Sequence, residues 1–238
     1  MSLSESAIRE AVVRSAKSLF DRGLTHGSTG NISIALDDGW LLTPTGSSLG
    51  TLDPAKLSKI DRSGVHTDGD APTKESLLHL AMYRERQSAG AVVHLHSTHS
   101  VALSLLDDLD PNDLLPPLTA YYVMRVGALP LVPYFPPGDP KLAQAIGGWA
   151  GKHHAMLLAH HGPIVAGTNL AAATDASEEL EETAKLFLMV RDQRYRTLSA
   201  EEVDQIRAKF GHPSGDQSSS RSTCTSSRKP GGGCLCPE

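Results

Sequence analysis

Cysteine is absent from residues 1–223, and the three in the chain, Cys224, Cys234 and Cys236, lie in its last stretch. The folding part therefore has no disulfide framework, and we expect a reducing compartment, the cytoplasm. No apolar run approaches the roughly 18 residues that a membrane span needs. The first residues also lack the basic-then-apolar layout of a secretory signal. These absences argue against a membrane protein and against a disulfide-stabilised secreted domain.

A surplus of basic residues is also missing. Lys and Arg number 22 against 27 Asp and Glu, a net charge of −5. A nucleic-acid surface requires a basic stripe, so no nucleic-acid partner is expected. The 238 residues are 39% hydrophobic, which is enough for a full core in one domain.

Helices and strands are predicted to alternate along the chain. Apolar residues at helical spacing, caps and first-turn prolines predict helices over 4–22, 72–87, 98–106, from 140 onward, 170–191 and 199–210. The second of these helices is expected to bury Leu77 and Leu78, Asp139 is expected to cap the fourth, and Ser199 with Glu202 forms a capping box for the last. Apolar runs between turn residues predict strands over 32–36, 40–43, 57–61, the segment after Gly90, and 154–161, with irregular extended segments over 121–127 and 129–134. The turn at 37–39 predicts that the first two strands form a hairpin. The predicted fold is α/β, a single domain with a mixed central β-sheet flanked by helices, over residues 1–212.

Residues 213–238 differ in composition from the rest of the chain. They are rich in Ser, Gly, Arg, Lys and Cys and have no hydrophobic periodicity, so we predict a disordered tail. Cys234 and Cys236 are two thiols without further partners, which favours an incidental pair over a metal site.

Two pairs of histidines follow apolar runs. His94 and His96 are two residues apart, so on one strand their side chains would project from the same face. His160 and His161 end a second run, and the Gly-Pro pair after them is predicted to stop the strand and turn the chain. Three imidazoles from two strand ends are one way to build a catalytic zinc site with an open position. Paired histidines alone are a weak signal.

Three short corners carry groups suited to anion binding. Each has small or hydrogen-bonding residues where an extended segment turns or a helix begins. They are Gly30-Asn31, Thr45-Gly46 and Thr73-Lys74. Singly, each corner reads as an ordinary turn or helix start. If they converge, they form a phosphate cradle, to which Lys74 adds a full positive charge.

The order of these motifs resembles the class II aldolase/adducin family. The similarity rests on GNIS at 30–33, TPTG at 43–46, PTKE at 72–75, VVHLH at 92–96 and HHG at 160–162, and it spans residues 5–211. The resemblance implies one Zn²⁺ per subunit, or another divalent metal, bound by His94, His96 and His161. It also implies that Glu75 is the catalytic acid/base and a ligand of the resting metal, and that the three corners bind the substrate phosphate.

One motif departs from the pattern of the sugar-phosphate aldolases, which commonly carry PSSE where this chain has PTKE. With the segments at 94–100 and 117–127, this makes the chain most similar to a decarboxylating branch of the family. That branch converts 3-oxo-tetronate 4-phosphate to dihydroxyacetone phosphate and CO₂ through a metal-stabilised enediolate. The implied partner is therefore a phosphorylated sugar acid.

Other polar residues were considered for the site. His99 follows the metal pair and suits either a helix start or a substrate contact. His160 is expected to be buried and structural, because it would face away from His161. The resemblance implies that a tyrosine of a neighbouring subunit reaches the site, which makes Tyr121, Tyr122 and Arg125 candidates. The remaining histidines carry no functional prediction: His26, His66, His79, His153, His154 and His212.

Two alternatives to the decarboxylase remain open. The same site would serve a sugar-phosphate aldolase or 4-epimerase of the fuculose or ribulose phosphate type. A non-catalytic, adducin-like interaction module would have lost the metal ligands, and this chain keeps them. The resemblance further implies a homotetramer with the site near a subunit interface.

Overall fold

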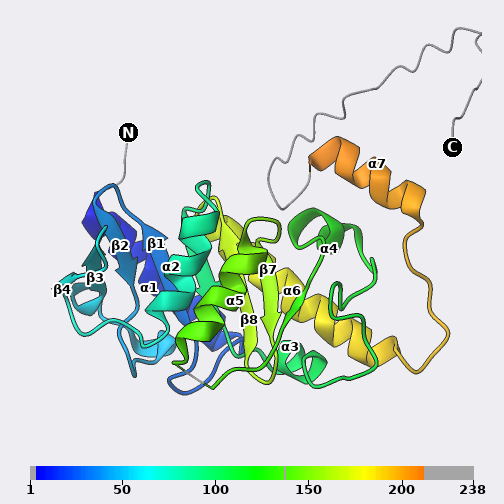
Figure 1. Cartoon of the computed structure of the whole chain (residues 1–238), viewed down its shortest axis with the longest axis horizontal. Helices are drawn as coiled ribbons and strands as arrows, with labels where there is room; N and C mark the ends of the chain where they lie inside the picture. Colours follow the sequence, from blue (N-terminus) through cyan, green and yellow to red (C-terminus); the bar gives the residue numbers. More distant parts are fainter. Residues whose placement is uncertain (1–3, 137, 212–238) are drawn as a thin grey trace, which may run out of the picture.

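An eight-stranded sheet runs through the described part of the chain, residues 4–136 and 138–211 of this computed structural model (Figure 1). Its strand order is β4-β3-β2-β1-β5-β8-β7-β6, antiparallel throughout except for the parallel pair β6 and β7. The strands are β1 (Asn31–Ala35), β2 (Gly39–Leu42), β3 (Ser58–Asp61), β4 (His66–Asp68), β5 (Ala91–His94), β6 (Leu131–Val132), β7 (Ala155–Leu158) and β8 (Gly162–Gly167). The predicted mixed sheet is confirmed.

Helices cover both faces of this sheet. One face carries α2 (Ser76–Glu85) and α5 (Pro140–Ala150), which lie in front of the strands in Figure 1. The opposite face carries α1 (Glu5–Asp21) and α6 (Leu170–Val190). The shorter elements are η1 (Leu49–Thr51), η2 (Pro54–Lys56), α3 (Thr98–Leu103), α4 (Ala120–Arg125) and α7 (Ala200–Phe210). The flanking helices of the predicted α/β fold are therefore present.

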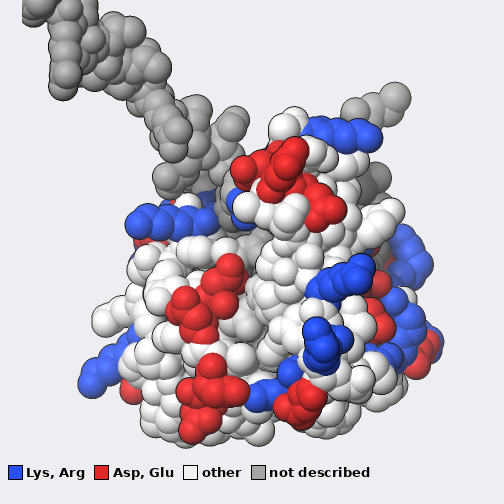
Figure 2. Space-filling model, turned by 90° about the vertical axis from the view of Figure 1, so that its right-hand side faces the viewer, with Lys and Arg blue, Asp and Glu red and all other residues white. Residues whose placement is uncertain are grey.

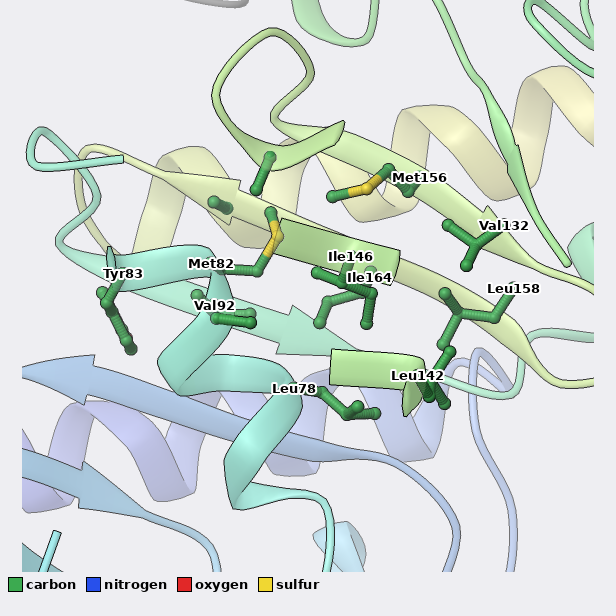
Figure 3. Close-up of a cluster of buried hydrophobic side chains, with 13 residues drawn as sticks. Leu78, Met82, Tyr83, Val92, Val132, Leu142, Ile146, Met156, Leu158 and Ile164 are labelled. Carbon is green, nitrogen blue, oxygen red and sulfur yellow. The ribbon is translucent and has the colours of Figure 1, made fainter. Parts of the chain in front are cut away.

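Side chains of β5 alternate between the two apolar cores. Val92 packs with Leu78 and Met82 of α2, in the cluster shown in Figure 3. Val93 packs instead with α1 on the other face. Because successive strand residues point to opposite faces, His94 shares the α2 face with Val92. His94 thus emerges where the α2 core ends.

Several local predictions are confirmed, because each depends on chemistry within a few residues. The Ser4 hydroxyl accepts from Ala7 N and begins α1, and Asp139 caps α5 with Pro140 at its first position. Ser199 and Glu202 form the predicted capping box of α7. The first two strands form the predicted antiparallel hairpin around 37–39.

Other boundaries were wrong. Helix α2 begins at Ser76 rather than Pro72, because Pro72 forms a bridge with Pro44 and residues 72–75 stay outside the helix. Leu77, predicted to be buried, is exposed. The 121–127 segment was predicted to be extended but contains α4, begun by the Thr119 hydroxyl accepting from Tyr122 N.

The chain beyond the second histidine pair also differs from the prediction. The Gly-Pro pair does not end the strand region, because Gly162 begins β8 and pairs back onto β7. Strand β4, at the sheet edge, was not predicted; all three of its residues are exposed, so it has no apolar alternation. The predicted 213–238 tail, with its three cysteines, lies outside the described residues.

Charged side chains of both signs lie on the face of the molecule that Figure 2 presents. Among the described helices, none is long and apolar enough to cross a membrane.

The α6 core gives a stability prediction. Leu180 is fully buried on α6, whereas Leu186 on the same helix is 37% exposed. Leu180→Ala should lower the free energy of unfolding by about 2–5 kcal/mol, because it removes buried methyl groups and leaves a cavity. The matched Leu186→Ala should change it by less than about 0.5 kcal/mol. Urea denaturation at one protein concentration measures both, and equal losses would contradict the assigned core.

Candidate active site

Glu75, His94, His96 and His161 converge in one cluster. Each offers one ligand atom, and these atoms all lie within 4.8 Å of one another. His94 Nε2 is 3.2 Å from His96 Nε2, and Glu75 Oε1 is 3.0 Å from His161 Nε2. Three imidazoles and a carboxylate are a donor set that suits a divalent metal of the first transition row. The four residues predicted as metal ligands are thus brought together from three parts of the chain.

Strand alternation places the first two histidines. His94 is the last residue of β5, and Leu95 turns into the opposite core, where it is fully buried. His96 therefore returns to the face of His94, and their ring centroids are 5.0 Å apart. The predicted same-face geometry is confirmed.

A tight connection between β7 and β8 places the third histidine. His160 has φ of 59°, the left-handed region that is uncommon for a residue with a Cβ. Gly162 follows with φ of 151°, and a Cβ there would lie 2.2 Å from Leu95 O. Only glycine permits this close approach of β8 to the end of β5. His161, held between them, faces His94 and His96.

His160 does not have the predicted buried role. It is exposed, and its ring contacts Tyr134 edge-on with centroids 5.8 Å apart. The prediction assumed that the strand continued through both histidines. The chain instead turns at His160, so alternation no longer applies.

His94 and His96 are neutral, the form in which an imidazole can bind a metal. His94 Nδ1 lies 2.8 Å from the carbonyl oxygen of Pro163, which can only accept, so this nitrogen carries the proton and Nε2 has a free lone pair. Burial lowers the pKa of His94. Burial, and to a smaller extent the neighbouring His94 and His161, lowers the pKa of His96 to about 3. This tautomer and protonation state fit a metal at the cluster.

Glu75 faces the histidines as an ionised carboxylate. Burial favours a raised pKa for Glu75, but the neighbouring His94 and the hydrogen bonds from His161 and Asn31 outweigh it and hold the pKa well below its ordinary value. Asn31 Nδ2 donates to Glu75 Oε2 at 2.7 Å. An ionised carboxylate can bind a metal ion or accept a proton.

The three predicted phosphate corners lie beside the cluster. Thr45 N donates to Ala71 O at 3.0 Å next to the Pro44–Pro72 bridge, so the second and third corners are adjacent. Gly30 has φ of 78° and packs against the carbonyl of His94. The Thr73 hydroxyl accepts from Glu75 N. Thr45, Gly46 and Lys74 are exposed and face solvent.

The side chain of Asn31 is hydrogen-bonded within the chain. Its amide nitrogen donates to Glu75, and its amide oxygen contacts His79 Nε2. Both polar atoms of the side chain are therefore engaged within the chain. The prediction missed this because it treated Asn31 as part of a turn, whereas Asn31 is the first residue of β1 and pairs with His94.

The α4 candidates lie at the other end of the sheet. Arg125 Nη2 is 3.4 Å from Asp175 Oδ2. Arg125 also lines a cavity of about 320 Å³ together with Gly167, the last residue of β8. β8 rises roughly 17 Å from Gly162 to Gly167, and His161 directly precedes Gly162 at the opposite end of the strand. Tyr122 is buried (1% exposed) and Tyr121 is exposed (58%). Of the two tyrosines, only Tyr121 is exposed at the surface of the chain.

His99 takes the helix-start role. Its backbone N–H and Nδ1 both bond Glu181 Oε1, at 2.9 and 2.8 Å. Glu181 also accepts from the backbone N–H of Ser100, so this carboxylate caps α3. The candidate substrate contact is thus fixed against α6.

Three residues beside the site carried no sequence prediction. Ser33, His79 and Tyr83 are buried and hydrogen-bonded to one another behind Asn31. The signal was present in the sequence: Asn31 and Ser33 are polar residues two apart on a strand, and Glu75, His79 and Tyr83 are spaced by four. Either pattern alone is unremarkable, and its meaning depends on α2 packing against β1.

This fold is shared with known proteins. The sequence model of a protein family, the class II aldolase and adducin N-terminal domain, matches residues 10–188 of this chain. The chain therefore belongs to the class II aldolase/adducin family.

Relatives of known name are similar over nearly their whole length. An Escherichia coli protein named 3-oxo-tetronate 4-phosphate decarboxylase is 51% identical over 205 residues, which is 86% of this chain and 97% of the relative. An Escherichia coli L-fuculose phosphate aldolase is 34% identical over 79% of this chain and 86% of its own length. The crystal structure of YgbL from Escherichia coli superposes with a TM-score of 0.83 at 48% identity, covering 85% of this chain and 99% of that one. The chain is an enzyme of this family, a lyase.

The backbone at His160 gives a prediction for the site. His160→Gly should keep the free energy of unfolding within about 1 kcal/mol, because glycine adopts φ of 59° without strain. His160→Val should cost about 1–3 kcal/mol and lower the bound metal per chain, because a β-branched residue resists this conformation next to His161. Thermal unfolding and elemental analysis measure the two effects. A valine variant as stable and metal-rich as the glycine variant would contradict the assigned turn.

Proposed function

We propose that this chain catalyses the metal-dependent decarboxylation of 3-oxo-tetronate 4-phosphate to dihydroxyacetone phosphate and CO₂. The observation that supports this proposal most directly is the cluster of Glu75, His94, His96 and His161, whose ligand atoms lie within 4.8 Å of one another. The name of the relative at 51% identity supports the choice of reaction.

The substrate is a β-keto acid, with a ketone at C3 next to the C2 that bears the carboxylate. Breaking the C1–C2 bond releases CO₂ and leaves its electron pair on C2, delocalised toward the C3 oxygen. A divalent metal held by the four ligands supplies Lewis-acid stabilisation of negative charge on substrate oxygen. We assign zinc to this role, because three imidazoles with a carboxylate suit it.

Glu75 is suited to the proton step. One of its carboxylate oxygens, Oε2, is held by Asn31, while Oε1 faces the histidine side of the cluster. Because the resting carboxylate is ionised, Glu75 first takes up a proton from water and then delivers it to C2, which completes the hydroxymethyl group of dihydroxyacetone phosphate. General acid catalysis of this kind contributes about 10²–10⁴-fold to a rate.

The corners at Gly30, Thr45-Gly46 and Thr73-Lys74 are proposed to hold the substrate phosphate. The exposed Lys74 supplies charge, and the turns beside it supply backbone N–H groups. Because these corners lie beside Glu75, a phosphate bound there would orient C2 of the substrate toward the carboxylate.

A homotetramer in the cytoplasm is the proposed state of the enzyme. Glu75 and His161 keep side-chain exposures of 17% and 12% in the single chain, which leaves the site open to a neighbouring subunit. The exposed Tyr121 is the residue proposed to reach a neighbour's site.

Aldol cleavage or epimerisation of a sugar phosphate is the second candidate function. The aldolase relative at 34% identity supports it, because the same cluster would stabilise the same type of enediolate. The adducin-like interaction module is disfavoured, because the complete ligand cluster has no role in it.

The first prediction is that product formation depends on metal. The enzyme should form dihydroxyacetone phosphate from 3-oxo-tetronate 4-phosphate, lose this activity with a chelator, and regain it with Zn²⁺. A coupled assay for dihydroxyacetone phosphate measures all three states. No product with Zn²⁺, Mn²⁺ or Co²⁺ would refute the decarboxylase, and cleavage of sugar 1-phosphates by the same preparation would favour the aldolase.

The second prediction concerns the carboxylate. Glu75→Gln should lower kcat by about 10²–10⁴-fold with KM within a few-fold, because the amide keeps the shape but cannot carry the proton. Glu85→Gln, an exposed glutamate at the end of the same helix, should leave both constants unchanged. Near-normal kcat in Glu75→Gln would remove this residue from the proton step.

A further inference from the structure

A continuous chain of buried hydrogen bonds leads away from Glu75 into the core. Glu75 Oε2 accepts a hydrogen bond from Asn31 Nδ2, and the amide oxygen of Asn31 is hydrogen-bonded to His79 Nε2. His79 Nδ1 lies 2.7 Å from Ser33 Oγ, which lies 2.9 Å from the hydroxyl of Tyr83. His79 and Ser33 are fully buried. The chain thus links the proposed acid/base to a tyrosine about two helical turns away.

Matched periods of a helix and a strand build this chain. Glu75, His79 and Tyr83 are four residues apart on or at the start of α2, a rise of about 6 Å per step. Asn31 and Ser33 are two apart on β1, a rise of about 6.7 Å. Each strand residue therefore lies between two helix residues. Tyr83 also packs in the α2 core, as Figure 3 shows, so the helix is held at this register.

The direction of the hydrogen bonds follows from the atoms that meet. Asn31 Nδ2 donates to Glu75 Oε2, which leaves the acceptor Oδ1 facing His79 Nε2. His79 must then donate from Nε2. Burial lowers the pKa of His79 to about 3, so the ring is neutral and its Nδ1 accepts.

The remaining two bonds are then also determined. Ser33 must donate its hydroxyl proton to His79 Nδ1, because that nitrogen has none. Tyr83 must donate its own to Ser33 Oγ. All donors thus point toward Glu75, and hydrogen bonds aligned in one direction strengthen one another.

We propose that Ser33, His79 and Tyr83 are positioning residues, which lock the amide of Asn31 so that it always donates to Glu75. The lock prevents the amide from turning its oxygen toward the carboxylate, and it fixes Oε2 while Oε1 points toward His161. The catalytic part of this inference rests on the proposed function of Glu75, whereas the hydrogen-bond direction does not.

The first test is the protonated nitrogen of His79. Solid-state ¹⁵N NMR of histidine-labelled protein distinguishes the two neutral tautomers and the doubly protonated ring, and His79→Leu assigns the signal. We expect the Nε2–H tautomer at neutral pH. The Nδ1–H tautomer or a doubly protonated ring would overturn the proposed direction. This readout needs neither substrate nor activity.

The second test compares two substitutions at position 79. His79→Gln can place an amide N–H near the position of Nε2 and donate to Asn31, whereas His79→Leu cannot. We expect His79→Leu to lose about 10–100-fold in Zn²⁺ affinity or kcat, with KM within a few-fold, as when other outer hydrogen-bond partners of metal sites are removed. His79→Gln should recover most of this loss. Calorimetric Zn²⁺ titration and steady-state kinetics measure the two quantities.

Single hydroxyl deletions keep the test decisive if either position-79 variant fails to fold. Ser33→Ala and Tyr83→Phe should each lower Zn²⁺ affinity or kcat at least threefold. Ser177→Ala is the matched control, since it removes an equally buried serine hydroxyl from α6, bonded only to Ala173 O. The control should change neither quantity. Wild-type values in both hydroxyl variants would overturn the proposal.

Failure of the proposed function has a different signature. A wild-type enzyme without decarboxylase or aldolase activity would refute the function, while the His79 tautomer and the Zn²⁺ affinities would still decide the positioning role.

Discussion

Antiparallel pairing at β5 is the constraint on which the rest of the site depends. β5 pairs with β8 on one side and with β1 on the other, so His94 lies between Ile164 and Asn31. The carbonyl of Pro163, two residues beyond His161, is thereby brought to His94 Nδ1 and sets its tautomer. The same pairing carries Asn31 toward Glu75. A one-residue slip would turn these side chains to the opposite face of the sheet.

The contact of α2 with β1 is polar where most of the core is apolar. Leu78, Ala81 and Met82 pack against the sheet, and His79 stands among them with hydrogen bonds at both ring nitrogens. A buried polar group costs little only if its partners are all present. This network satisfies its members and ends at the carboxylate. The hydrogen-bonded residues therefore hold α2 against β1 and at the same time position Glu75.

Local chemistry explains which predictions succeeded. The caps of α1, α5 and α7 and the β1–β2 hairpin involve residues within a few positions of one another, and all were predicted. The α2 start, α4 and the exposed His160 were not. Pro72 could have begun a helix, but pairing with Pro44 holds it extended. His160 could have continued a strand, but the return of β8 requires a turn there.

The amino-acid sequence by itself determined the type of chemistry, because three histidines, a glutamate and their order along the chain are already a metal-ligand set. It also determined the strand periodicity that puts His94 and His96 on one face. Only the tertiary structure decided that Asn31 serves Glu75, that His79 is part of the site, and that α4 lies at the far end of the sheet. These relations join residues 44 or more positions apart, and strand pairing and helix docking bring them together. No local pattern contains that information, because each half of the contact looks ordinary alone.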